Sequence, residues 1–370
     1  MNRIFMAGLG GRIFTCVLWA IASMDNPANS NGTENADYLS DALSKLAGVS
    51  ASGPKNLADI AERIDHDSTH GRFPFEVRYR DTDDCADADG CIGFLIFRRY
   101  RDGRHFEVPV YAQPDPAKLP LKKLGVDVVI DATGRFLTAE KAQGFIDAGA
   151  RKVLMSAPAK DDTPLIIYDI NGDQDTGLPF VSLASCTTNA AAPIVYALGE
   201  TFGYPESVFL NTTHAVTNSQ KMLDGNSGKL ENSFAGLNNI VVTDTGATKS
   251  LQKIFPELKQ TTGIACRVPV ENGSILCLVM EFGNAKGLTK ESVLEALNEF
   301  GNNRIRRLLR VSHRQTMISS YVVDRSETSV VAPGQIVVIG GTVQIVAGYD
   351  NEYAYAYHLA LAALNCPLPA

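Results

Sequence analysis

The stretch Ser185-Cys186-Thr187-Thr188-Asn189 stands at the middle of this chain of 370 residues, between two different secondary-structure patterns. A β-like run at 178–183 precedes it, and an apolar run typical of a helix follows at 190–198. A cysteine at such a junction lies near unpaired backbone N–H groups and the positive end of the helix dipole, which favour a thiolate. Cys186 is therefore a candidate nucleophile; the alternative is a buried, inert thiol among small residues.

The residues before Cys186 predict a sheet whose strands alternate with helices. A short apolar run at 3–7 leads into Gly8-Leu9-Gly10-Gly11 and then into an apolar stretch of helical length at 12–24. A strand, a glycine turn and a helix begin a dinucleotide-binding fold, in which the helix N-terminus meets the pyrophosphate. The third glycine of G-x-G-x-x-G would fall at Ile13, so the motif alone is weak. Strands at 128–130 and 152–155, with a helix at 140–148 between them, extend a doubly wound parallel sheet.

Two positions compete for the second strand of this sheet. If 17–24 were the strand, Asp25 would be the acid that binds the ribose, but no room would remain for the helix. If 12–24 is the helix, the polar stretch 26–37 is an insertion, an extra helix follows at 36–46, and the strand lies at 46–52. We favour the second arrangement, because a βαβ unit needs about 30 residues. It places Ser52 where an acid normally binds the ribose 2′-hydroxyl, so NADP could be admitted.

The residues after Cys186 predict a second domain with a different pattern. Strands with antiparallel-like alternation are expected at 208–213, 266–270, 274–282 and 342–346, and helices at 289–300 and 352–364. The expected fold is thus an α/β Rossmann-type dinucleotide-binding domain followed by an α+β catalytic domain with a mostly antiparallel sheet.

Composition narrows the classes of function. The chain is 45% hydrophobic and 20% charged, as is ordinary for globular proteins. A net charge of -7 argues against nucleic acid or an anionic membrane as the main partner. Glycines interrupt the apolar run at 1–24, which could otherwise be taken for a signal peptide, and no later run approaches the ~18 residues of a membrane span. Seven cysteines without a C-x-x-C pair favour reduced thiols in the cytoplasm and predict no metal site.

A cysteine nucleophile needs a base, and anion sites would indicate its substrate. Among six histidines, His214 is preferred because it ends a β-like run after the cysteine helix. Thr245 and Gly246 open a helix whose N-terminus suits phosphate, or is an ordinary N-cap. Arg267, in an apolar strand, is either a paired buried charge or a phosphate-binding fork.

At these motifs the chain resembles glyceraldehyde-3-phosphate dehydrogenase and its close relative, erythrose-4-phosphate dehydrogenase. The resemblance runs almost from end to end, and its segments are Ala7-Gly8-Leu9-Gly10, Asp67-Ser68-Thr69-His70-Gly71, Ala132-Thr133-Gly134, Ser156-Ala157-Pro158, Ser185-Cys186-Thr187-Thr188-Asn189, His214-Ala215-Val216-Thr217, Thr245-Gly246-Ala247, Arg267-Val268-Pro269 and Tyr349-Asp350-Asn351-Glu352-Tyr353. It implies a phosphorylating oxidation of glyceraldehyde 3-phosphate with NAD or NADP, in a cytoplasmic enzyme that is usually a homotetramer.

The resemblance also implies roles for single residues. Cys186 would attack the aldehyde, and His214 would lower the thiol pKa and take the hydroxyl proton. The residues implied to bind substrate and inorganic phosphate are Ser185, Thr187, Thr217, Thr245, Gly246 and Arg267. Those implied to bind the cofactor are Gly8, Gly10, Gly11, Arg12, Ile13, Ser52, Thr133, Gly134, Ser156 and Asn351. The cofactor domain would span 1–184 and the catalytic domain 185–350, with a last helix, 351–370, packing back on the cofactor domain.

The chain also departs from the family pattern. Pro114 stands where the family usually has arginine, Gly348 where it has tryptophan, and the segment 229–234 lacks the arginine that binds phosphate. These changes leave three alternatives: an erythrose-4-phosphate dehydrogenase, a catalytically impaired scaffold or binding protein, and a non-phosphorylating, hydrolytic variant.

Overall fold

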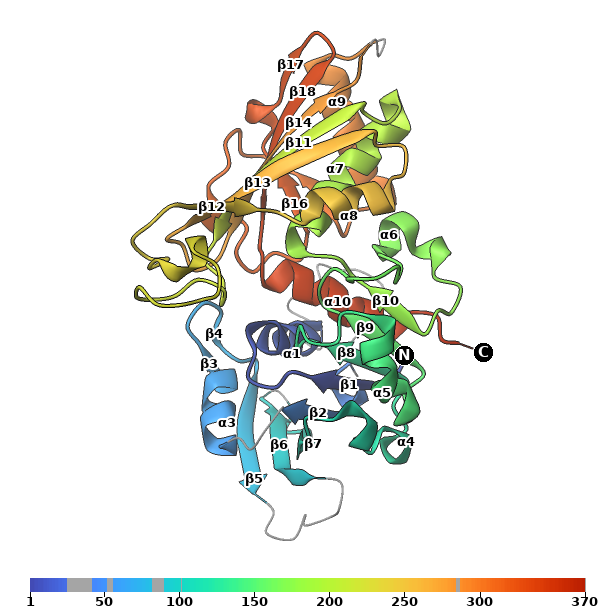
Figure 1. Ribbon diagram of the computed structural model, residues 1–370, viewed down its shortest axis with the longest axis vertical. Helices are drawn as coiled ribbons and strands as arrows, with labels where there is room; N and C mark the ends of the chain where they lie inside the picture. The colour runs from blue at the N-terminus through green and yellow to red at the C-terminus, as the bar shows by residue number, and fades with distance from the viewer. Residues whose placement is uncertain (25–41, 52–55, 82–89, 101, 284–286, 370) are drawn as a thin grey trace. The chain divides into compact units, whose positions relative to one another are not determined.

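The chain divides into two compact units, shown in Figure 1. Unit 1 comprises Met1–Ile166, Asp173–Leu183 and Ala356–Ala370, and unit 2 comprises Ile167–Gly172 and Ala184–Tyr355. The computed structural model describes residues 1–24, 42–51, 56–81, 90–100, 102–283 and 287–369. Within them, no helix has the length and apolar character that crossing a membrane requires.

Unit 1 is built on an eight-stranded sheet in the order β10-β9-β8-β1-β2-β7-β6-β5. Six strands are parallel, namely β1 (Ile4–Ala7), β2 (Leu46–Ala51), β7 (His105–Ala112), β8 (Val128–Asp131), β9 (Lys152–Met155) and β10 (Phe180–Ser182). The antiparallel strands β5 (Phe75–Asp81) and β6 (Cys91–Arg99) extend it at one edge. Strand order reverses at β1, so the carboxyl ends of β1, β2 and β8 form the place where such folds bind ligands.

The helices of unit 1 confirm the favoured arrangement of the first βαβ unit. They are α1 (Arg12–Met24), α3 (Leu57–Asp65), α4 (Leu121–Leu124), α5 (Ala139–Asp147) and most of α10 (Tyr353–Asn365), and a two-stranded ribbon joins β3 (His66–Asp67) to β4 (Gly71–Arg72). The alternative strand at 17–24 is wrong, because these residues belong to α1, nine of whose thirteen residues are buried. The extra helix expected at 36–46 appears in the described residues only as a 3-10 turn, Leu43–Lys45. Ser52, Asp25 and the whole expected insertion at 26–37 lie outside the described residues.

Unit 2 contains the mostly antiparallel sheet that the sequence predicts. The order is β12-β13-β11-β14-β18-β16-β15, with β17 paired to β18. The strands are β11 (Ser207–Ala215), β12 (Val241–Asp244), β13 (Gln260–Val268), β14 (Ser274–Glu281), β15 (Leu309–Val311), β16 (Ser329–Val331), β17 (Val337–Ile339) and β18 (Thr342–Tyr349). Two pairs are parallel, β11 with β13 and β15 with β16.

The helices of unit 2 cover one face of this sheet. They are α6 (Tyr168–Asn171), α7 (Cys186–Phe202), α8 (Ala247–Ile254) and α9 (Lys290–Glu299). Figure 1 shows α7, α8 and α9 on the same side of the sheet. Residues of β14 alternate between buried and half-buried, because every second side chain points toward the helices. The other face of the sheet is therefore only half-buried.

A buried ion pair ties together distant parts of unit 1. Lys152, at the start of β9, and Asp175 are both fully buried, with Nζ 2.7 and 2.6 Å from the two carboxylate oxygens. The ammonium group also donates to the carbonyl oxygen of Pro367 at 2.8 Å. The pair thus joins the sheet, the loop before β10 and the C-terminal segment.

We expect Asp175→Ala to destabilise unit 1 by about 3–5 kcal/mol, because it leaves the ammonium group of Lys152 buried without its counter-charge. Urea unfolding followed by circular dichroism measures the change. Lys259→Ala is the matched control, since its ion pair with Glu206 is exposed and should contribute less than about 1 kcal/mol. An unfolding midpoint of Asp175→Ala equal to that of the control would contradict the role of the pair.

Candidate functional site

Cys186 is the first residue of α7, at a turn that leaves little freedom to the chain. Ala184 has a φ of 57°, which is uncommon for a residue with a side chain. Ser185 is the N-cap, and its Oγ accepts a hydrogen bond from the N–H of Thr188 at 3.2 Å. The carbonyl oxygen of Ala184 accepts from the hydroxyl of Tyr355 at 3.2 Å. The expected placement of the cysteine at a helix N-terminus is confirmed.

His214 faces the thiol from the adjacent strand β11. The Sγ of Cys186 lies 3.5 Å from Nε2 of His214. The other ring nitrogen, Nδ1, is 2.7 Å from the carbonyl oxygen of Ala215, which only accepts hydrogen bonds. Nδ1 must therefore carry the proton of the neutral ring, and Nε2 is left to accept the proton of the thiol.

The resting pair is neutral rather than ionic. Burial, together with the positive charge of Arg267, lowers the pKa of His214 to about 3. Burial also raises the pKa of Cys186, although the charge of Arg267 acts in the opposite direction. Burial of His214, which is 3% exposed, therefore disfavours its charged form, and the implied lowering of the thiol pKa by a charged His214 stays a prediction. The unprotonated Nε2 of the neutral His214 ring is therefore placed to accept a proton.

Tyr349 and Thr212 support the Cys186–His214 pair through a hydrogen bond and a ring contact. The sequence did not identify either as a site residue. The hydroxyl of Tyr349 lies 3.1 Å from Oγ1 of Thr187 and 2.7 Å from Oγ1 of Thr212. Its ring meets the ring of His214 edge-on, with centroids 5.9 Å apart and planes at 77°. Tyr349 belongs to a recognised motif, but only the strand register of the folded sheet shows that it packs on the imidazole.

Arg267 lies beside His214 because β11 and β13 pair in parallel with these two residues in register. Its Nε and Nη1 are buried and have no hydrogen-bond partner among the described residues. A buried guanidinium without an acceptor is costly. Of the two sequence interpretations of Arg267, this favours the anion-binding fork over the paired charge.

A second chain of hydrogen bonds connects His214 to Asn351 through the main chain. Ser274, fully buried at the start of β14, accepts from the N–H of Ala215 at 3.1 Å and donates to Oδ1 of Asn351 at 2.7 Å. The carbonyl of the Asn351 amide is thereby engaged, and its Nδ2 is left to donate elsewhere. Ser274 carries no signal in the sequence and was missed.

The other candidate anion ligands lie on two loops of unit 2. The hydroxyl of Thr217, just after β11, contacts Ser219 and Gln220 at 2.8 and 2.9 Å. Gly246 is the N-cap of α8, and Thr245 accepts from the N–H of Ala247 at 3.2 Å. The structure thus groups Cys186, His214, Thr187 and Arg267 through direct contacts, strand register and charge, while Thr217, Thr245 and Gly246 stand on adjoining loops.

In unit 1, the glycine turn adopts a form that side chains would block. Gly8 has a φ of +113°, and a Cβ there would lie 2.8 Å from the backbone of Ala132. The N–H groups of Gly8 and Leu9 both donate to the carbonyl oxygen of Ser50, at 3.0 and 2.9 Å. Gly11 donates back to Gly8 at 3.0 Å, which closes the turn before α1. Ile13 occupies the place of the third glycine and is half-buried.

The remaining cofactor candidates lie at the carboxyl ends of β8 and β9. Thr133 donates from its N–H and its hydroxyl to Oδ1 of Asp131 at 2.9 and 2.6 Å, and Gly134 follows with a φ of +67°. The N–H of Ser156 donates to the carbonyl oxygen of Asp131 at 3.1 Å. A pocket opens beside them, and its lining includes Gly8, Ser50, Pro114, Thr133, Arg135 and Phe136. These candidates, except Ser52, are thus brought to the switch point of the sheet.

Comparison with known proteins gives similarity across most of the chain. The family model for the C-terminal domain of glyceraldehyde 3-phosphate dehydrogenase matches residues 185–351. Glyceraldehyde-3-phosphate dehydrogenase 1 of Kluyveromyces lactis is 35% identical over 293 residues, which are 79% of this chain and 83% of that protein. Glyceraldehyde-3-phosphate dehydrogenase A of Escherichia coli is 35% identical over 299 residues, covering 80% and 84%. The enzyme of Haloarcula vallismortis is 39% identical over 258 residues, covering 69% and 76%.

We expect iodoacetamide to alkylate Cys186 at a rate that rises with pH, with a midpoint above the ordinary range of a cysteine, because only the thiolate reacts and burial raises its pKa. Arg267→Ala should slow the reaction roughly threefold or more at a fixed pH near 8, since the guanidinium favours the thiolate. Peptide mass spectrometry follows Cys186 separately from the other cysteines. Arg310→Ala, which removes an exposed charge paired with Glu327, is the control; equal rates in the two variants would exclude the electrostatic role of Arg267.

Proposed function

Since the chain belongs to the glyceraldehyde-3-phosphate dehydrogenase family, we propose that it oxidises glyceraldehyde 3-phosphate and phosphorylates the product to 1,3-bisphosphoglycerate, using NAD or NADP. The observation that carries this proposal is the Cys186 thiol beside an unprotonated His214 Nε2. Arg267 stands in register with His214, and its Nε and Nη1 have no hydrogen-bond partner among the described residues. A nucleophile, a base and an anion site are the groups that this reaction requires.

In the proposed reaction each proton has a carrier. Cys186 passes its proton to His214 as Sγ attacks the aldehyde carbon, and His214 returns it to the aldehyde oxygen of the hemithioacetal. The bound nicotinamide supplies the hydride acceptor. His214 removes the hydroxyl proton as the hydride leaves, and the product is a thioester on Cys186. Inorganic phosphate then attacks the thioester carbon, which releases the acyl phosphate and restores the thiol.

Two groups of residues support the charged ligands in this proposal. Arg267 binds a phosphate through its buried Nε and Nη1. Ser185, Thr187, Thr217, Thr245 and Gly246 add hydroxyl and backbone donors, and the first turn of α8 is oriented as an anion site. The backbone N–H of Cys186, at the start of α7, stabilises the developing oxyanion.

The cofactor is assigned to the glycine turn of unit 1. Gly8, Gly10 and Gly11 allow the close approach of a pyrophosphate, and the first turn of α1, with Arg12 and Ile13, supplies N–H donors. Thr133, Gly134 and Ser156 border the same carboxyl edge of the sheet. In unit 2, Ser274 binds Oδ1 of Asn351, so Nδ2 of Asn351 would be available to donate to a nicotinamide carboxamide. Unit 1 is then the cofactor domain and unit 2 the catalytic domain of a cytoplasmic enzyme.

A non-phosphorylating reaction is the second candidate, and one segment favours it. In residues 229–234, where the family has a phosphate-binding arginine, the exposed large side chains are Leu230 and Phe234. Lys229, also exposed in this segment, offers a point charge but no bidentate fork. Weaker binding of free phosphate would let water replace it as the attacking group. Erythrose 4-phosphate remains the alternative aldehyde, since Arg267 recognises a phosphate and not the length of the sugar.

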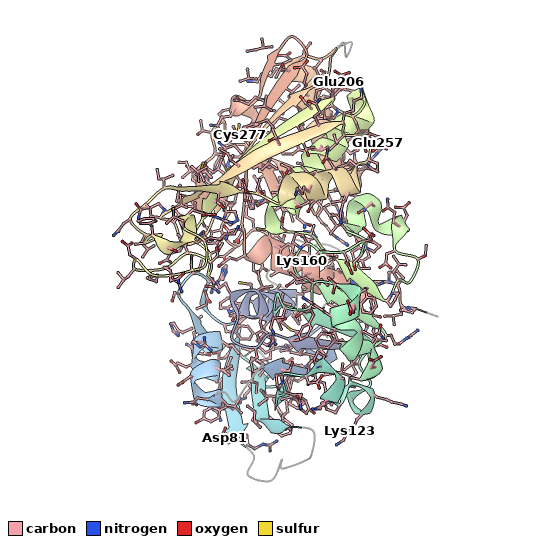
Figure 2. All side chains as sticks on the ribbon, viewed as in Figure 1. Asp81, Lys123, Lys160, Glu206, Glu257 and Cys277 are labelled. Carbon is pink, nitrogen blue, oxygen red and sulfur yellow. The ribbon has the colours of Figure 1, made fainter. Side chains whose placement is uncertain are left out.

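We also propose a homotetramer, supported by apolar surface on unit 2. Exposed large side chains gather in one segment, at Met222, Leu223, Leu230, Phe234, Leu237 and Ile240. The open face of the sheet adds the exposed Phe209 on β11, the half-buried Val279 opposite it on β14, and the half-buried Cys277, two residues before Val279. Figure 2 labels Cys277 on this sheet. Contiguous apolar surface of this kind is typical of interfaces between subunits.

Sedimentation velocity at micromolar concentration is expected to give the mass of four chains. Phe209→Glu should shift the protein to smaller species, because it places a charge in the apolar face, while Lys118→Ala on unit 1 should not. A wild-type protein that sediments as a monomer would contradict the proposed assembly.

Formation of NADH or NADPH from glyceraldehyde 3-phosphate, measured by absorbance with and without inorganic phosphate, tests the activity. We expect phosphate-dependent turnover, and a loss of at least about 10³-fold in Cys186→Ser, because the serine hydroxyl is a far weaker nucleophile near neutral pH. Turnover without phosphate would favour the hydrolytic candidate. A folded wild-type protein without turnover on either sugar phosphate and with either cofactor would favour the scaffold alternative.

A further inference from the structure

The cations around the glycine turn differ in whether their charge is balanced. Arg12, at the start of α1, forms an ion pair with Asp67, whose side chain is 5% exposed. The other oxygen of Asp67 accepts from the N–H groups of Thr69 and His70, both at 2.9 Å. Arg12 therefore brings little net positive charge to a ligand in the turn.

Arg63 is the contrasting cation. It lies on α3, the helix that follows β2, and its guanidinium reaches back to the glycine turn: Nη2 is 3.3 Å from the position that a Cβ of Gly10 would take. Its Nε donates to the carbonyl oxygen of Asp59 at 3.4 Å, an i,i+4 contact within the helix. In the described part of the chain no carboxylate forms an ion pair with Arg63, so its charge is available beside the bare backbone of Gly10.

The described lining of the neighbouring pocket carries no carboxylate of the kind that distinguishes NAD enzymes. An acid at the end of the second strand binds the ribose 2′-hydroxyl and repels a 2′-phosphate, whereas an arginine nearby accommodates that phosphate. The described end of β2 carries Ser50 and Ala51, and both line the pocket at the switch point. Among the residues that the structure describes, the lining includes no aspartate or glutamate, and it does include Arg135. The potential in the pocket is therefore positive.

We propose that the protein selects NADP over NAD, and that Arg63 is the residue that determines this selection by binding the 2′-phosphate. This inference rests on the proposed function, whose cofactor it specifies. The pyrophosphate is bound by the N–H groups at the start of α1, on one side of the turn. Arg63 approaches Gly10 from α3, on the side of β2, where the adenosine ribose lies in this type of fold. A guanidinium there forms two parallel hydrogen bonds to a phosphate monoester.

Calorimetric titration of the full-length protein with four ligands tests the proposal. NADP is compared with NAD, and adenosine 2′,5′-bisphosphate with adenosine 5′-monophosphate, so that each pair differs only in the 2′-phosphate. We expect wild-type protein to bind the 2′-phosphorylated member at least tenfold more tightly. Arg63→Ala should weaken the binding of the 2′-phosphorylated ligands about tenfold, and that of NAD and adenosine 5′-monophosphate less than twofold. Arg63→Lys should recover part of the lost affinity, since lysine keeps the charge but not the two parallel hydrogen bonds. Lys118→Ala, an exposed cation of unit 1, should change neither.

Each alternative outcome has one meaning. An equal loss for NAD and NADP in Arg63→Ala would place the arginine on a group that both cofactors share, and would overturn the proposal. Tighter binding of NAD by wild-type protein would overturn it as well, even with full dehydrogenase activity. The expected binding pattern without aldehyde oxidation would support the cofactor assignment and refute the proposed function instead.

Discussion

The hydrogen bond from Nδ1 of His214 to the carbonyl oxygen of Ala215 fixes the arrangement on which the site depends. It decides which ring nitrogen carries the proton, and so decides that Nε2 faces Cys186 as an acceptor. The bond is made within one stretch of β11, but three neighbouring strands hold it in place. β13 places Arg267 beside the imidazole, β14 supplies Ser274 to the N–H of Ala215, and β18 ends in Tyr349, whose ring packs on His214. His214 is therefore held on β11, a central strand that pairs with β13 on one side and β14 on the other.

The sequence predicted those parts of the molecule that depend on local order. Residues 12–24 form a helix because apolar side chains recur without strand alternation, and Cys186 lies at a helix start because Ser185 is a strong N-cap. Tyr349, Thr212 and Ser274 could not be assigned to the site in the same way. Their roles come from register across β11, β14 and β18, and the sequence does not state which residues of distant strands stand opposite each other. The short strands β15, β16 and β17, of three residues each, were missed because so few residues show no period.

The burial of Cys186 and His214 shows why the sequence alone could not settle whether the pair is charged. A cysteine at a helix N-terminus near a histidine favours a thiolate if both groups are hydrated. Here His214 is buried between strands and beside a guanidinium, and both effects oppose the imidazolium. The sequence placed the two groups together correctly, whereas the degree of burial, which sets the sign of the effect, appeared only in the folded sheet. Burial likewise raises the pKa of Cys186, which favours the neutral thiol.

Arginine charge is distributed in a way that follows from these constraints. Nε and Nη1 of the half-buried Arg267 have no acceptor among the described residues, and a ligand anion would offset the cost of leaving them unsatisfied. Arg12 is neutralised by Asp67, and Arg63 keeps its charge at the surface of the turn. Pro114, where the family has arginine, and Arg135 line the same pocket. The positive charge that Pro114 lacks is therefore supplied by Arg135. The guanidinium carbon of Arg135 lies 5.6 Å from the centroid of the Phe136 ring. If the pocket holds the adenosine of the proposed cofactor, its charge comes from a different side chain than in the family pattern. The preference among adenosines would then depend on where the remaining guanidinium groups stand.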